Sequence, residues 1–122
     1  MSTTLRIELF PADLTETKRF YCSALGFVIT RDDRNAPSPY LALARGDVQV
    51  GAAQRLEPQE PIYRRPPSGV ELVLEVDDLA AERRRVSESG WPIDEEVSER
   101  AWGLKDFRIS DPDGYYWRVT TR

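Results

Sequence analysis

Two stretches of this sequence decide its fold: LRIELFPADL at residues 5–14 and VELVLEVDDL at residues 70–79. In each, apolar residues recur at every second position, which is the pattern of a strand that buries one face. An aspartate then stands where a helical pattern begins, Asp13 in the first stretch and Asp78 in the second, and aspartate is a preferred N-cap. Since the two align at a constant offset of sixty-five residues, they indicate an internal repeat. The alternative is that two similar strand–helix pairs coincide.

Each repeat continues in the same order. After the first helix, which Gly26 should end and where Glu16 suggests a capping box, we expect strands at 27–30, 40–44 and 48–51. After the second helix, which Gly90 should end, a weak strand candidate starts at Trp91, and strands at 107–110 and 115–120 close the chain. This predicts an α+β protein of tandem βαβββ modules that form one curved, half-open barrel of eight strands. A second subunit is expected to complete its cavity.

The chain is predicted to be one domain spanning residues 1–122. The first module covers 1–54 and the second 69–122, and a proline-rich stretch at 55–68 connects them. In the turn at 111–114, Pro112 and Gly114 favour a closing hairpin that pairs Ser110 with Tyr116 and Arg108 with Arg118. An apolar set then shares the opposite face: Phe107, Ile109, Trp117 and Val119.

Composition excludes several classes of protein. The net charge of −4 disfavours general nucleic-acid binding, which needs a basic face. Histidine is absent, which removes the commonest general base and transition-metal ligand. No apolar run reaches membrane length and no secretory signal is recognisable at the start. With a single cysteine, Cys22, the expected location is the cytoplasm.

Three segments together resemble a known family: DLTETKRFYCSALGF at 13–27, GVELVLEVDDLAAERRRV at 69–86 and WGLKDFRISDPDGYYWRV at 102–119. They are similar to the first helix, the fifth strand with the second helix, and the closing hairpin of vicinal-oxygen-chelate proteins, the glyoxalase, bleomycin-resistance and dioxygenase superfamily. The resemblance covers nearly the whole chain. It implies tandem modules and a homodimer.

The resemblance also implies where a metal would be bound, on strands one, four, five and eight. Those positions fall on Arg6, Gln49, Glu71 and Arg118. Because arginine does not coordinate a divalent cation in proteins, we expect no metal, no cofactor and no catalytic residue. The chain then resembles most the metal-free, antibiotic-binding type. An oxygen-ligated Mg²⁺ or Ca²⁺ held by Glu8, Glu71 and Glu75 is the alternative.

We therefore expect a binding protein that sequesters a bulky, partly aromatic small molecule in the grooves of a homodimer, with neither nucleic acid nor membrane as partner. Two of the predicted binding residues have an alternative role. Trp102 could instead fill the end of the barrel, and Tyr63 could instead be an aromatic residue of a surface loop. The predicted ligand-binding residues are Arg6, Glu8, Phe10, Tyr40, Gln49, Tyr63, Glu71, Trp102, Arg108, Tyr116 and Arg118. Two other functions stay open: a lyase or isomerase with Glu71 or Glu75 as base, with or without an oxygen-ligated metal, and an accessory or regulatory subunit with a vestigial cavity.

Overall fold

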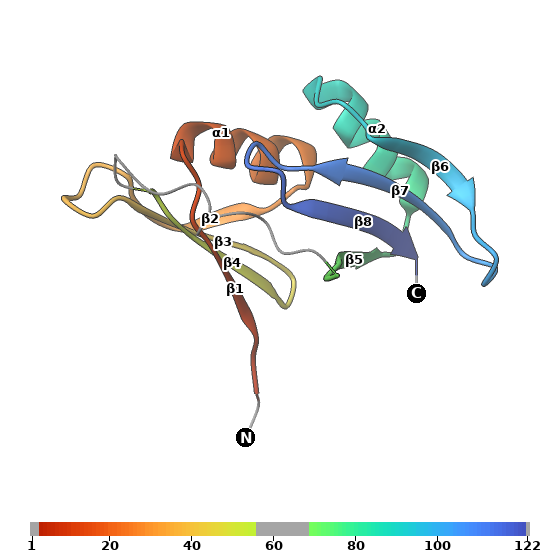
Figure 1. Ribbon diagram of the computed structural model, residues 1–122, viewed down its shortest axis with the longest axis horizontal. Helices are drawn as coiled ribbons and strands as arrows, with labels where there is room; N and C mark the ends of the chain where they lie inside the picture. The colour runs from red at the N-terminus through yellow and green to blue at the C-terminus, as the bar shows by residue number, and fades with distance from the viewer. Residues whose placement is uncertain (1–2, 56–68, 122) are drawn as a thin grey trace. The chain divides into compact units, whose positions relative to one another are not determined.

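The computed structural model describes residues 3–55 and 69–121, and the chain divides into two compact units, Met1–Arg65 (unit 1) and Pro66–Arg122 (unit 2) (Figure 1). Each unit holds one four-stranded sheet and its own helix. Most of the predicted connector at 55–68 lies outside the described residues, and so does Tyr63. The predicted module boundaries therefore stay a prediction.

Unit 1 has the predicted strand, helix and three further strands. They are β1 (Arg6–Leu9), α1 (Leu14–Lys18), η1 (Arg19–Ala24), β2 (Val28–Asp33), β3 (Tyr40–Arg45) and β4 (Val48–Ala53). The sheet order is β1-β4-β3-β2, with β1 parallel to β4 and the other pairs antiparallel. The Asp13 carboxylate caps α1 by accepting from the Thr15 backbone N–H at 2.9 Å, as the sequence predicted.

Unit 2 repeats this topology. Its elements are β5 (Leu72–Val76), α2 (Leu79–Ser89), β6 (Glu95–Glu99), β7 (Lys105–Ser110) and β8 (Tyr116–Thr121). The order β5-β8-β7-β6, with β5 parallel to β8, matches unit 1 element for element. Asp78 caps α2, and Gly90 ends it in the left-handed conformation at φ 77°. The internal repeat and the α+β class are therefore confirmed.

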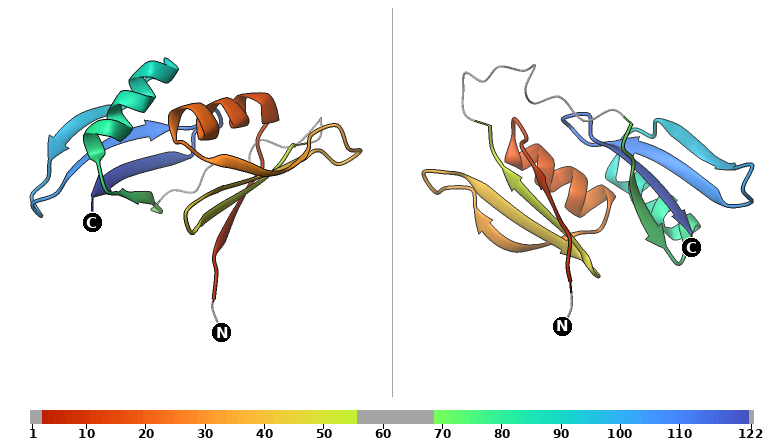
Figure 2. Two further views of the ribbon diagram at one scale, coloured as in Figure 1. Left: turned by 180° about the vertical axis from the view of Figure 1, so that it is seen from behind. Right: turned by 60° about the horizontal axis from the view of Figure 1, so that its bottom comes forward.

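The core of each unit lies between one face of the sheet and the helix. Figure 2 shows α1 and η1 against one face of the first sheet and α2 against one face of the second, and contacts join α1 to β3 and β4, and α2 to β8. The predicted register of β7 and β8 is confirmed, with Arg108 opposite Arg118 and Ser110 opposite Tyr116. The set predicted for the other face is fully buried: Phe107, Ile109, Trp117 and Val119. In each unit the face of the sheet opposite the helix (the open face) carries polar residues, such as Glu8 and Gln49 in unit 1 and Glu71 and Arg118 in unit 2.

One expectation about local structure is wrong, and one local feature was not predicted. The strand expected from Trp91 begins only at Glu95. Trp91 is half-buried, and its indole N–H donates to the Ser110 carbonyl at 2.8 Å, so it pins the segment before β6 to β7 instead of filling the core as Phe27 does. The first helix also changes type at Arg19, where η1 takes up π-helical hydrogen bonding that the apolar periodicity did not predict.

Within residues 3–55 and 69–121, no helix is long and apolar enough to cross a membrane.

Candidate functional site

A pocket of about 750 Å³ lies on the open face of unit 1. Four predicted binding residues line it: Arg6, Glu8, Tyr40 and Gln49. The sheet register explains this, because Arg6 stands opposite Gln49 and Glu8 opposite Gly51, while the small Ala42 and Ala44 stand on the neighbouring strand. Because Ala42, Ala44 and Gly51 have little or no side chain, the space above them stays unfilled and forms the pocket.

A chain of polar contacts crosses this pocket. The Tyr40 hydroxyl donates to the Glu8 carboxylate at 2.9 Å, and Arg6 Nε lies 2.5 Å from the same carboxylate. Gly51 makes room for them, since a Cβ there would overlap Tyr40 Oη and a Glu8 carboxylate oxygen. Burial first, and the Glu8 carboxylate second, raise the pKa of Tyr40 above its ordinary value.

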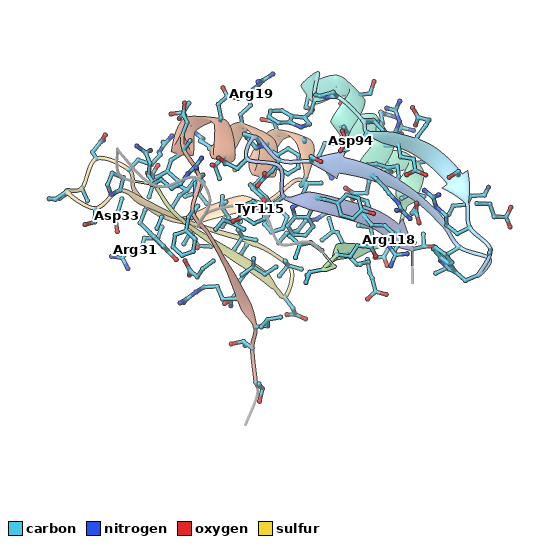
Figure 3. All side chains as sticks on the ribbon, in the orientation of Figure 1. Arg19, Arg31, Asp33, Asp94, Tyr115 and Arg118 are labelled. Atoms are coloured by element: carbon cyan, nitrogen blue, oxygen red, sulfur yellow. The ribbon has the colours of Figure 1, made fainter. Side chains whose placement is uncertain are left out.

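Two further residues differ in their relation to this pocket, because Arg31 lines it and Phe10 does not. Arg31 also lines it, and Figure 3 labels Arg31 and its partner Asp33 on β2, whose charged groups lie 2.5 Å apart. Phe10, a predicted binding residue, follows the end of β1 and is 38% exposed. It is not among the described residues that line the pocket.

A second pocket, of about 520 Å³, lies on the open face of unit 2. Its walls include three predicted residues, Glu71, Trp102 and Arg118, and the carboxylate of Glu75. The Trp102 side chain is 57% exposed, so a large flat apolar surface is accessible at the wall of this pocket. Its ring lies against the Arg118 guanidinium, with Arg118 Cζ 5.4 Å from the ring centroid.

Glu71 contacts three of the other binding residues predicted in unit 2. Its carboxylate accepts from the Tyr116 hydroxyl at 2.7 Å and lies 3.1 Å from Arg118 Nη2 and 3.9 Å from Arg108 Nη1. Arg108 also lies over the Tyr116 ring, 5.8 Å from its centroid. All five residues predicted in this unit are thus in one cluster with Trp102 at its edge. Figure 3 labels Arg118 on β8.

Sequence reasoning missed the buried centre of this cluster, Asp106. Its side chain is fully buried and accepts from Arg100 Nε at 2.8 Å, while Arg108 Nε and Arg118 Nη1 lie 3.5 and 3.8 Å away. The hydrogen bonds from Arg100 to Asp106 and Glu95 raise the pKa of that guanidinium. The alternation of β7 was the available signal, because it places Asp106 on the same face as Arg108.

The four positions where a metal would be expected can now be tested against their surroundings. Arg6 is paired with Glu8 and Arg118 with Glu71, so guanidinium groups occupy the space beside those two carboxylates. Among the residues that the structure describes, no group of three or more Asp, Glu, Cys or His side chains is arranged to hold a metal ion. The donor set of these positions therefore does not fit a divalent cation.

Comparisons with known proteins agree on one family. A family model described as the Glyoxalase/Bleomycin resistance protein/Dioxygenase superfamily matches residues 4–119. No curated protein sequence matches the chain.

Several solved structures share the fold. TioX from Micromonospora sp. ML1 has 20% sequence identity and a TM-score of 0.76, over 98% of each chain. TnmS3, an antibiotic binding protein from Streptomyces sp. CB03234, has 22% identity and a TM-score of 0.72, over 99% of this chain and 96% of that one. A glyoxalase-related enzyme from Fulvimarina pelagi has 19% identity and a TM-score of 0.75, over 100% and 89%. At these identities the three structures show the fold.

Proposed function

This chain belongs to the glyoxalase/bleomycin resistance protein/dioxygenase superfamily, and within it we propose that it is a metal-free protein that binds and sequesters a bulky, partly aromatic small molecule, such as an antibiotic or natural product. One observation carries the proposal: Arg118, at a position where the resemblance implies a metal ligand, pairs with Glu71 and lies under the exposed Trp102 in the wall of a pocket. A homodimer and a cytoplasmic location are part of the same proposal.

The chemistry of the open faces supports binding without turnover. Glu71 is engaged by both Arg118 and the Tyr116 hydroxyl, and Glu8 by both Arg6 and Tyr40, so each carboxylate already has charged and polar partners within its own unit. Trp102, by contrast, offers a flat apolar surface on which an aromatic ligand can stack. The solved structures of similar fold include TnmS3, an antibiotic binding protein.

A second function, a lyase or isomerase, rests on Glu75. This carboxylate lines the unit 2 pocket and has neither a hydrogen bond nor an ion pair with any residue in the described part of the chain. It is therefore the carboxylate of this pocket with the best access to a substrate proton. The two functions can be distinguished experimentally, because a binding protein releases its ligand unchanged and a lyase or isomerase converts it.

Tryptophan fluorescence tests the binding function directly, because all three tryptophans, Trp91, Trp102 and Trp117, lie in unit 2. Chelator-treated protein is titrated with a panel of aromatic antibiotics that includes metal-loaded bleomycin. We expect saturable quenching near one ligand per chain, its loss in Trp102→Ala, and recovery of the ligand unchanged. Val28→Ala is the matched control, since Val28 is an apolar residue of unit 1 that is 62% exposed. Failure of the whole panel to bind, or binding only after a divalent metal is added, would reject the proposal.

A further inference from the structure

The charged groups of the unit 2 cluster balance one another, and one carboxylate of the same pocket, Glu75, stands outside this balance. Three arginines face three acidic side chains within ion-pair distance, and these six groups are Arg100, Arg108, Arg118, Glu71, Glu95 and Asp106. Glu75 is not part of this network, although it lines the same pocket as Glu71 and Arg118. The pocket wall therefore carries one acidic charge that no arginine of the network compensates.

The position of Arg118 makes the excess of negative charge greater on the side of the pocket that a ligand would contact. Arg118 is shared between Glu71 at 3.1 Å and the fully buried Asp106 at 3.8 Å, so its positive charge is already neutralised from within the protein. Its side chain is only 19% exposed, whereas that of Glu71 is 35% exposed. A molecule in the pocket thus meets the two carboxylates more directly than the guanidinium.

The indole ring of Trp102 is a second feature of this pocket that would attract a positively charged ligand. The face of an indole ring carries negative electrostatic potential and attracts cations, and this ring already has the Arg118 guanidinium against it. More than half of the side chain remains exposed at the pocket, which leaves ring surface for a ligand. Leu104 and Val73 on the same wall suit an apolar ring system.

We propose that the unit 2 pocket selects a cationic ligand, a planar aromatic molecule bearing a protonated amine, with the ammonium group between Glu75 and the ring of Trp102. The inference rests on the proposed binding function and names the charge of its ligand. The unit 1 pocket provides a contrast, because its lining includes Arg6 and Arg31 but a single carboxylate, Glu8. It should show no such selection.

A matched pair of probes tests the proposal: 9-aminoacridine, a cation at neutral pH, and acridine-9-carboxylate, an anion with the same three rings. Binding is measured by equilibrium dialysis at low salt. We expect the cation to bind about tenfold more tightly than the anion, and the difference to shrink at about 0.5 M salt as the charges are screened. Glu75→Gln should weaken binding of the cation by about fivefold and leave the anion unchanged or slightly tighter.

Two control variants separate local contacts from general effects. Glu88→Gln removes the same charge from an exposed position on α2, outside the lining of the pocket, and should leave both affinities unchanged. Trp102→Leu keeps an apolar side chain but removes the ring, and should weaken the cation by about fivefold and more than the anion. Circular dichroism confirms that each variant is folded.

The outcomes distinguish this inference from the function beneath it. Equal binding of the two acridines, preference for the anion, no binding of either, or no effect of Glu75→Gln would each overturn the cationic preference. The binding function itself would still stand if the antibiotic panel binds in the fluorescence titration. If that panel also fails, both proposals fall together.

Discussion

Replacing Asp106 with asparagine tests whether a buried carboxylate organises the unit 2 cluster. The side chain is fully buried, and Arg108 and Arg118 lie 3.5 and 3.8 Å from its oxygens. Asparagine keeps the shape but removes the charge, so these guanidinium groups lose the anion that compensates them inside the protein. Removing one partner of a buried ion pair costs about 3–5 kcal/mol. Because asparagine still accepts hydrogen bonds, we expect about 3 kcal/mol.

Urea unfolding followed by tryptophan fluorescence measures this loss in the unit concerned, since all three tryptophans lie in unit 2. With a slope of about 1.5 kcal/mol per M, a loss of about 3 kcal/mol moves the midpoint down by about 2 M. Asp47→Asn is the matched control, because Asp47 is exposed in the turn between β3 and β4 and should change stability by less than about 0.5 kcal/mol. If Asp106→Asn is no more destabilising than this control, the cluster does not depend on its buried charge and the reasoning is refuted.

Three smaller changes test other contacts. Gly51→Ala should cost about 1 kcal/mol in urea unfolding, because its Cβ would separate Tyr40 from Glu8, and an equal cost in a Tyr40→Phe background would contradict this. Burial and then the hydrogen bond to its carboxylate partner raise the pKa of Tyr116. Its contribution to stability is thus complete below about pH 10, the unfolded value, and is lost as pH rises through the folded pKa. Tyr116→Phe should therefore flatten the fall in stability above about pH 10, and an unchanged alkaline profile would argue against that coupling. Asp78→Ala should cost about 1 kcal/mol by removing the cap of α2 at 3.0 Å, with Glu88→Ala, at an exposed position of the same helix, as the control in thermal unfolding by circular dichroism.

Much of the fold could be predicted because local rules and burial agree along the chain. Strand alternation and an aspartate N-cap recur in both halves, and the turn at 111–114 fixes the register of β7 and β8. The strand expected from Trp91 was wrong because a tertiary hydrogen bond, from the Trp91 indole to the Ser110 carbonyl, holds this residue outside the sheet. The π-helical turn of η1 depends likewise on packing: Phe20 and Tyr21 are fully buried there, and no propensity rule encodes that.

The candidate site could be predicted where residues follow strand alternation and not where side chains reach across strands. Arg108, Tyr116 and Arg118 were assigned correctly to one face of the hairpin, because register decides it. Asp106 stands on that face too, but strand alternation does not show that Arg100, which follows the end of β6, will reach it at 2.8 Å. The contacts of such long side chains depend on the folded backbone and cannot be predicted from the local sequence.

Native mass spectrometry of chelator-treated protein, incubated with the aromatic antibiotics of the fluorescence panel, tests the central claim most directly. It reports ligand mass, stoichiometry, bound metal and assembly at once. The account predicts one unmodified ligand per chain and no requirement for a divalent metal. A bound product of altered mass, or ligand retained only after metal is restored, would contradict sequestration and point to an enzyme.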